Sequence, residues 1–326
     1  MSNSLKIVWA TAVALIAGVV IGITMFGKPS AGTASHGAAG KERIIMITHG
    51  QAADPYWNIV KNGAEQASRQ LGVTLDYRAP ETFDMIRMGE LITSAANQRP
   101  DGIIVSIPDA SALRDPIRSA VRAGIPIVSI NSGSDVSAGL GALIHVGQDE
   151  YETGKRVGER LRTEGARKVI CINQEVGNTA LDARCRGVLD GSGANGFVLP
   201  TSIDPQEVKS KIVAALAGDP GIDAVVALSA PQVGEPAVEA VRAARRPVKV
   251  ASFDMSPAFL QAIGRGEALF AIDQQAYLQG YLSTVLLTNR IRYGLMPANR
   301  LIESGPNFVT RAEAANVLTL SQRSIR

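Results

Sequence analysis

The feature that most limits the possible folds is a regular alternation, starting at Arg43, of short apolar runs with longer segments of helical periodicity. Several of the apolar runs are continuous in Val and Ile, as expected for strands buried on both faces of a parallel sheet. The predicted strands are residues 44–48, 74–78, 102–106, 126–130, 143–146, 168–172, 197–200, 224–228, 248–253 and 269–272. The predicted helices are residues 56–71, 83–97, 111–123, 151–164, 179–189, 205–216, 232–243, 257–264 and 276–288. This βαβ order predicts an α/β fold with doubly wound parallel sheets.

The number of strands bears on how the chain is divided. Ten strands are many for one open sheet, so we expect two sheets. A chain of 326 residues is long enough for one large or two medium domains. An eightfold βα barrel is the alternative fold, because its strands and helices alternate as well.

The first 40 residues predict export. The segment 7–26 holds 20 residues without a charge, after a short polar start that contains Lys6. Signal peptides usually have an apolar region of about 7–15 residues, whereas about 20 can span a bilayer, so a cleaved signal peptide and an uncleaved membrane anchor both remain open. Residues 28–40 are rich in Gly, Ala and Ser and predict a flexible tether. In both cases the chain from Lys41 onward is expected on the far side of the membrane.

Charge and cysteine content exclude some classes. The formal net charge is only +3 and no dense Lys/Arg block occurs, which gives no support for nucleic-acid binding. Two cysteines, Cys171 and Cys185, are too few for a zinc site. They fall in a predicted strand and in the next helix, so an exported chain could join them in a disulfide, and two buried thiols are the alternative.

Polar side chains follow most of the predicted strands at their carboxyl ends, where open parallel sheets bind ligands. These residues are Asp54, Tyr56, Trp57, Asn131, Ser132, Arg184, Ser229, Asp254 and Gln274. Carboxylates accept hydrogen bonds from hydroxyls, Arg donates from a rigid fork, and amides do both. Aromatic faces cover the apolar side of a sugar ring. The set therefore predicts a site for a polyhydroxylated ligand.

Each of these residues also has an ordinary structural explanation. Asp54 before a proline could be the N-cap of the following helix, and Asp254 could be a cap as well. Tyr56 and Trp57 could be part of the core. Arg184 could pair with an aspartate on its own helix surface. Their joint position at strand ends favours the binding interpretation.

Signals for catalysis are weak. The motifs G-x-S-x-G, G-x-x-x-x-G-K-[ST] and H-E-x-x-H are absent from the sequence. The histidines are His36, His49 and His145, and none has an evident nucleophile beside it in the pattern. We therefore expect neither an enzyme nor a cofactor, and a secreted glycosidase on a barrel remains the enzymatic alternative.

The same residues resemble a known family, the periplasmic sugar-binding proteins of ABC importers in the ribose-binding-protein-like group, over roughly residues 41–317. The resemblance rests on the segments Asp54-Pro55-Tyr56-Trp57, 146–149 leading into Gly154, 177–180 leading into 184–187, 252–254 and 271–275. It implies two Rossmann-like lobes joined by a hinge of three crossovers, near 146–148, 274–275 and 303–305. The expected N-terminal lobe is 41–146 with 276–304, and the expected C-terminal lobe is 147–275 with 305–326.

The resemblance also implies roles for individual residues. Asp54 would hydrogen-bond the sugar, and Tyr56 and Trp57 would cover its ring. The remaining ligand contacts would map to Asn131, Ser132, Arg184, Asp254 and Gln274. The chain departs from the family where Asn131-Ser132 replaces a common Asp-Arg pair and Ser229-Ala230 a common Asn-Asp pair. These departures leave the identity of the sugar open.

The implied function is the solute-binding component of an ABC transporter. It would be a periplasmic monomer that captures a neutral monosaccharide or sugar alcohol, because Arg184 is the one basic residue among the mapped positions. It would deliver the ligand to a membrane permease and its ATPase. The alternative is a membrane-tethered sugar sensor that signals to a kinase. Regulators that share this fold carry an N-terminal helix-turn-helix, and the apolar segment in that place argues against DNA binding.

Overall fold

The structure is a computed structural model that describes residues 41–50, 54–193, 195–321, 323 and 325–326. The predicted signal peptide or anchor and its tether, residues 1–40, lie outside the described residues. Within the described ranges, no helix is both long and apolar enough to cross a bilayer.

In the described part of the chain the strands form two sheets, as predicted, each of six strands, and the barrel alternative is wrong. The first sheet has the order β11-β5-β4-β3-β1-β2 and the second the order β12-β10-β9-β8-β6-β7. The first sheet contains β1 Arg43–Ile47, β2 Thr74–Arg78, β3 Gly102–Ser106, β4 Ile127–Asn131, β5 Ile144–Gly147 and β11 Leu301–Glu303. The second contains β6 Lys168–Asn173, β7 Asn195–Pro200, β8 Ala224–Ala227, β9 Lys249–Phe253, β10 Phe270–Asp273 and β12 Asn307–Val309. The pairs are parallel except for β10 with β12.

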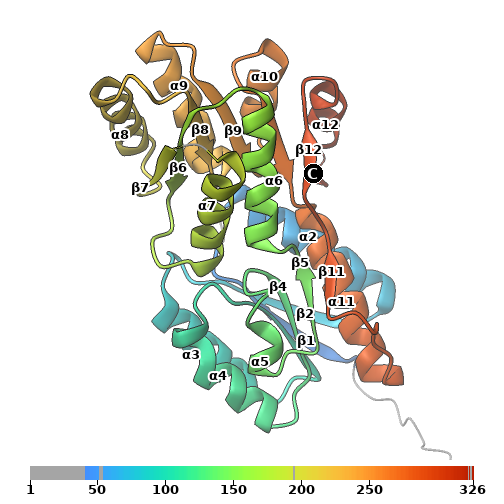
Figure 1. The fold of residues 1–326 in the computed structure, drawn as a ribbon. Helices are drawn as coiled ribbons and strands as arrows, with labels where there is room; N and C mark the ends of the chain where they lie inside the picture. Colours follow the sequence, from blue (N-terminus) through green and yellow to red (C-terminus); the bar gives the residue numbers. More distant parts are fainter. Residues whose placement is uncertain (1–40, 51–53, 194, 322, 324) are drawn as a thin grey trace, which may run out of the picture. The chain divides into compact units, whose positions relative to one another are not determined.

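Helices cover both faces of each sheet, which explains why the central strands are apolar on both sides. The helices are α2 Pro55–Leu71, α3 Met85–Asn97, α4 Ala110–Arg122, α5 Ser137–Leu140, α6 Glu150–Thr163, α7 Thr179–Ser192, α8 Pro205–Gly218, α9 Glu235–Ala244, α10 Pro257–Arg265, α11 Ala276–Tyr293 and α12 Ala314–Ser321. Figure 1 shows α3 and α4 on one side of the first sheet and α2 with α11 on the other, and each side has its own apolar core. On the second sheet, α6 and α7 pack on one face and α8, α9, α10 and α12 on the other.

The chain passes between the two sheets three times. It leaves the first sheet after β5, returns after β10 through Gln274 and Gln275 into α11, and leaves again between β11 and β12. The second and third passages lie against each other, because the amide of Asn307 donates to the backbone carbonyl of Asp273 at 3.4 Å. The fold is therefore the type I periplasmic-binding-protein fold, which the resemblance implied.

Two pairs of helices pack with their backbones in direct contact. A Cβ atom on Gly187 of α7 would lie 2.2 Å from the carbonyl oxygen of Tyr151 on α6, and one on Gly154 of α6 would lie 2.2 Å from the carbonyl oxygen of Arg184. Gly63 and Gly280 bring α2 and α11 together in the same way, with Cβ clearances of 2.0 and 1.9 Å. No side chain fits at these distances, so glycine is required there.

A disulfide joins Cys171 on β6 to Cys185 on α7, across the turn between the strand and the helix, with a Cα–Cα distance of 5.6 Å. Both residues are fully buried. The bond fastens α7 to the second sheet one residue away from Arg184.

The short elements near the C-terminal end differ from the prediction. The three-residue strands β11 and β12 and the helix α12 were not predicted, and α11 runs five residues beyond its predicted end at Thr288, to Tyr293. A π-helical turn at Ala230–Gly234 precedes α9, where the pattern predicted the α-helix itself from Gln232. Three-residue strands have no room for a periodic pattern, so sequence periodicity cannot detect them.

Candidate functional site

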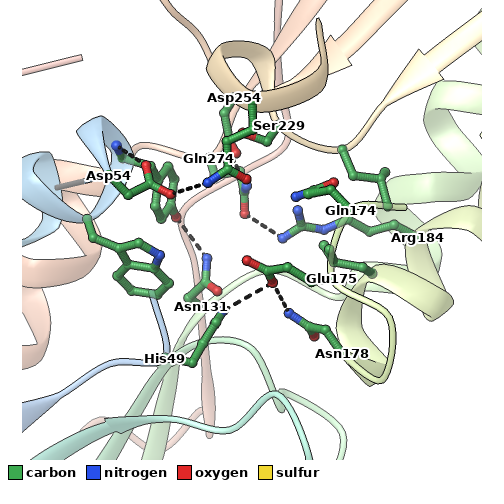
Figure 2. Close-up of a pocket in the computed structure, with 15 residues that line it drawn as sticks. His49, Asp54, Asn131, Gln174, Glu175, Asn178, Arg184, Ser229, Asp254 and Gln274 are labelled. Atoms are coloured by element: carbon green, nitrogen blue, oxygen red, sulfur yellow. Dashed lines mark hydrogen bonds and ion pairs between the residues drawn. The ribbon is translucent and has the colours of Figure 1, made fainter. Parts of the chain in front are cut away.

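A polar cavity lies at the carboxyl ends of the strands, between side chains from both sheets (Figure 2). The space between its walls, including the part open to solvent, is about 350 Å³. About 40 Å³ of this space can hold the centres of water-sized molecules, so the walls lie close together around the cavity. It is lined by His49, Asp54, Tyr56, Trp57, Asn131, Gln174, Glu175, Asn178, Leu181, Arg184, Leu228, Ser229, Gln232, Asp254 and Gln274.

Asp54 has two roles at the start of α2. Its Oδ1 accepts the backbone N–H of Tyr56 at 2.9 Å, which makes it the N-cap, with Pro55 as the first helical residue. Its Oδ2 accepts from the side-chain amide of Gln232 at 2.9 Å, and Gln232 belongs to the second sheet's side of the cavity. The capping explanation and the position in the cavity are therefore both correct.

Tyr56 and Trp57 form an aromatic wall with His49. The Tyr56 and Trp57 rings meet edge to face at 5.2 Å between centroids, and His49 meets Trp57 at 4.8 Å. Trp57 is 4% exposed and also belongs to the core of the first sheet. The indole lies so close to Gly50 that a Cβ there would be 1.6 Å from Nε1. Gly50 is thus what leaves room for the indole at the cavity.

Asn131 ends β4 with φ 59°, in the left-handed region, which is unusual for a residue other than glycine. Its amide donates to the hydroxyl of Tyr56 at 2.8 Å. Ser132 does not line the cavity, although the sequence selected it. Its hydroxyl donates instead to Oδ1 of Asn131 at 2.9 Å, so Ser132 supports a residue that lines the cavity.

Arg184 is 3% exposed and lies under the cavity, so the expected alternative of a surface pair with an aspartate on its helix is wrong. Its Nε and Nη2 donate to the carboxylate of Glu150 on α6, and Nη2 also donates to Oε1 of Gln274 at 2.9 Å. Phe253 lies beneath the guanidinium at 4.9 Å. Burial acts to lower the pKa of Arg184, but the charge and hydrogen bonds of Glu150 raise it, and the net shift is upward. The guanidinium is therefore charged at any pH at which the protein is folded.

Asp254 follows β9 with φ 60° and is the second cavity residue in the left-handed region. It does not cap α10, because Ser256 does so by accepting the N–H of Phe259. The amide of Gln274 donates to Oδ1 of Asp254 at 2.5 Å. Left-handed residues outside turns collect at functional sites, where the surrounding structure holds them.

The segment after β6 supplies side chains that the sequence interpretation did not select. Gln174, Glu175 and Asn178 line the cavity beside Arg184. Glu175 accepts from the amide of Asn178 at 2.7 Å, and its Oε2 lies 3.7 Å from Nε2 of His49 on the first sheet's side (Figure 2). Their position after a strand end was the available signal, but nothing in the pattern showed which of the polar residues in this loop turn inward.

Burial shifts the titration of three carboxyl groups that line the cavity. It raises the pKa of Asp54 to about 6, partly offset by the hydrogen bond from Tyr56. It raises the pKa of Glu175 to about 7 and that of Asp254 to about 7, because an ionised carboxylate loses its hydration there. Burial, with the charge of Arg184, lowers the pKa of His49 to about 3, so His49 is neutral at physiological pH.

The donor set suits hydrogen bonding to a small molecule and not metal binding. Among the residues that the structure describes, no three His, Cys, Asp or Glu side chains stand close enough together to hold a metal ion. The cavity offers carboxylate and amide acceptors, the guanidinium of Arg184 and the edges and faces of aromatic rings. These groups can bind and orient a polyhydroxylated ring.

Comparisons with known proteins agree with this arrangement. Residues 44–294 match the family described as periplasmic binding protein domain. A crystal structure of a carbohydrate transporter from Acidothermus cellulolyticus 11B in complex with myo-inositol is similar, with a TM-score of 0.84 and 36% identity over 88% of this chain and 100% of that one. The xylose/arabinose-binding protein XylF of Sulfolobus acidocaldarius is 27% identical over 86% of this chain and 74% of its own length. The ribose import binding protein RbsB of Haemophilus influenzae is 24% identical over 78% of this chain and 87% of its own.

The fold and the cavity define a solute-binding protein, and the chain belongs to the periplasmic binding protein family. Within that family it is a sugar-binding component of an ABC transporter, as the resemblance implied. The family consists of binding proteins and not of enzymes, so the expectation of a non-enzymatic function is confirmed.

Proposed function

We propose that the chain captures a single polyhydroxylated ring, a monosaccharide or a cyclitol, in the cavity between the two sheets. The observation that carries this proposal is the convergence of an aromatic wall, Tyr56 and Trp57, with the carboxylates of Asp54 and Asp254 and with Arg184. The myo-inositol complex of the Acidothermus protein supports a ring of this size. Asp54, Tyr56, Trp57, Asn131, Arg184, Ser229, Asp254 and Gln274 are the proposed ligand contacts, and Ser132 is a supporting residue.

The test is a thermal-shift screen of the purified full chain with pentoses, hexoses and cyclitols, and with a disaccharide as the control for size. A ligand at 100 times its Kd should stabilise the native state by about 2.7 kcal/mol, which raises Tm by a few degrees. Stabilisation by none of the single rings would contradict the proposal.

We also propose that binding is coupled to a hinge motion of two lobes, residues 41–146 with 276–304 and residues 147–275 with 305–326. Contacts between these lobes on either side of the cavity support it. The N–H and the hydroxyl of Thr179 both donate to the carbonyl of Pro108 at 2.9 Å, and Gln232 donates to Asp54. A ligand that bridges the same two surfaces would favour the closed arrangement.

The proposed partners are a membrane permease and its ATPase, with the binding protein acting as a monomer in the periplasm after export through residues 1–40. The membership in the family of ABC transporter components supports this assignment. Pull-down with the purified chain, with and without ligand, tests the partner. Capture of a permease that depends on ligand is the expected result, and capture of a sensor kinase instead would contradict it.

A further inference from the structure

The carboxyl groups of the cavity outnumber its cations. Asp54, Glu175 and Asp254 line the cavity, and the basic side chain among its lining residues is Arg184. Among the described residues, neither Asp54 nor Asp254 has a basic side chain within salt-bridge distance, and Glu175 has His49 alone. The cavity therefore holds negative charge that its own walls do not balance.

Arg184 provides that balance only in part, because its charge lowers the pKa of Glu175 and Asp254 but is not among the causes that shift Asp54. A further carboxylate also engages it directly. Glu150 is 4% exposed and does not line the cavity, and it takes both Nε and Nη2 of Arg184. This bidentate pair occupies both of these donors. The side-chain amide of Gln148 donates to the carboxylate of Glu150 at 3.0 Å and holds it in place.

His49 does not supply a balancing positive charge. Its Nδ1 shares a hydrogen bond with the hydroxyl of Ser106 at 2.8 Å, and its Nε2 faces Glu175. The imidazole is buried next to a charged guanidinium, so it carries no proton charge at neutral pH.

The three carboxyl groups also act on one another. Burial raises the pKa of Glu175 and Asp254 most, the charge of Asp54 raises both further, and the charge of Arg184 lowers both. Asp54 is therefore the carboxylate whose charge acts on both of the others. Nearby, Oε1 of Gln174, whose side chain is buried and lines the cavity, has no hydrogen-bond partner among the described residues. A buried acceptor without a donor is costly, so this group too lacks a donor that a ligand could bring.

A neutral polyol would satisfy the acceptors only in part. Its hydroxyls can donate to the carboxylates. Glu175 and Asp254, with a pKa of about 7, are only partly ionised at neutral pH, but Asp54, with a pKa of about 6, is mostly ionised, and burying its charge under a neutral ring costs free energy. An anionic sugar would add to the repulsion. A protonated amine supplies positive charge and three N–H donors at one point. The carboxylates and the unpaired amide oxygen of the cavity can accept from such donors.

We propose that the ligand of this cavity is an amino derivative of such a ring, an amino sugar or an amino cyclitol, with its ammonium group beside Asp54. The inference rests on the proposed capture of a single polyhydroxylated ring and narrows it to rings that carry an amine. The aromatic wall of Tyr56 and Trp57 is compatible with it, because ring faces attract cations as well as covering the C–H side of a sugar.

The experiment measures Kd by calorimetry at pH 7 for matched pairs, each an amino derivative and its neutral parent. The pairs are inosamine with myo-inositol, D-glucosamine with D-glucose and D-galactosamine with D-galactose. We expect at least one amino derivative to bind ten times more tightly than its parent or better. If the neutral parents bind and no amino derivative binds more tightly than its parent, this inference is wrong and the proposed function stands. If neither the parents nor the derivatives bind, the proposed function fails as well.

Two substitutions test whether a preference for the amino derivative over its neutral parent comes from the charge of Asp54. Asp54→Asn keeps the N-cap, since Asn caps as well as Asp, and removes one charge. We expect the ratio of the two Kd values to fall at least threefold in this variant. The matched control is Glu90→Gln, which neutralises a 59% exposed side chain on α3 and should leave the ratio unchanged. An unchanged ratio in Asp54→Asn, or an equal fall in Glu90→Gln, would overturn the assignment to Asp54.

Discussion

Single side chains in this protein combine a structural role with a position in the cavity, two explanations that the sequence pattern treats as alternatives. Asp54 caps α2 with one carboxylate oxygen and faces the cavity with the other. Arg184, Glu150 and Gln274 form a buried chain in which each charge has a partner. Asn131 and Asp254 occupy left-handed backbone positions at strand ends, next to the cavity. We therefore expect substitutions of these residues to change the free energy of unfolding.

The raised pKa of Asp254 predicts a pH-dependent contribution to stability. The carboxyl has a pKa of about 7 when folded, against 3.8 for the free group, so the folded state binds a proton that the unfolded state releases between these values. The wild type should therefore gain stability relative to Asp254→Asn as pH falls from 8 to 5, by roughly 2 kcal/mol, with no further change above about pH 8. Urea unfolding of the ligand-free protein at pH 5, 6, 7 and 8 measures this difference. A difference that does not vary with pH would show that burial does not perturb Asp254.

At the scale of elements, the site is built on helices that glycine contacts lock to their neighbours. α7 carries Arg184 and α6 carries its partner Glu150, and these helices touch backbone to backbone through Gly154 and Gly187. The salt bridge between Arg184 and Glu150 depends on this short separation. Packing between helices thus sets the geometry of a charge pair in the cavity wall.

Gly187→Ala should force α6 and α7 apart. The new Cβ would lie 2.2 Å from the carbonyl oxygen of Tyr151, and backbone cannot yield as a flexible side chain does. We expect a loss of about 2–3 kcal/mol in the free energy of unfolding, with weaker ligand binding. The control is Gly89→Ala in α3, where the nearest atom would be an ordinary 3.7 Å away, and where alanine should add about 0.5–1 kcal/mol. Equal effects of the two substitutions in chemical denaturation would refute the close-packing argument.

The sequence predicted the long elements well, because periodicity over ten or more residues records which face is buried. Ten strands and nine helices were predicted, and each has a counterpart in the structure, whereas β11 and β12 are too short to show a pattern. Strand-end position identified eight of the nine selected residues as cavity-lining. It failed for Ser132, one residue too far along, and for Glu175 and Gln174, since the inward turn of a loop depends on its hydrogen bonds.

At the scale of the whole molecule, the cavity is bounded by contacts that the protein makes with itself. Pro108 and Thr179 meet on one side of it, and Asp54 and Gln232 meet across it. In the proposed hinge motion, such contacts would favour the closed arrangement even before ligand binds. The apparent affinity rises with the fraction of ligand-free protein that is already in the binding-competent state.

Thr179→Val tests this influence on closure. Valine keeps the backbone N–H that donates to Pro108 and removes the hydroxyl that donates to the same carbonyl. One hydrogen bond is worth about 0.5–1.5 kcal/mol, so the apparent Kd should weaken by about 2–10-fold. Small-angle scattering of the empty protein should show a larger radius of gyration. The control is Thr93→Val, whose hydroxyl donates to Gly89 within α3. An unchanged Kd in Thr179→Val would mean that this contact does not influence closure.

The disulfide between Cys171 and Cys185 bears on when the protein becomes competent to bind. Cytosolic thiols are kept reduced, so the bond forms only after the exported chain reaches an oxidising compartment. Before that, α7 and its Arg184 are held to β6 by packing alone. Before export the chain is therefore expected to have a less firmly braced cavity wall than after the bond has formed. We therefore expect the chain to bind its ligand less tightly before export, while the two thiols are reduced, than after the bond has formed.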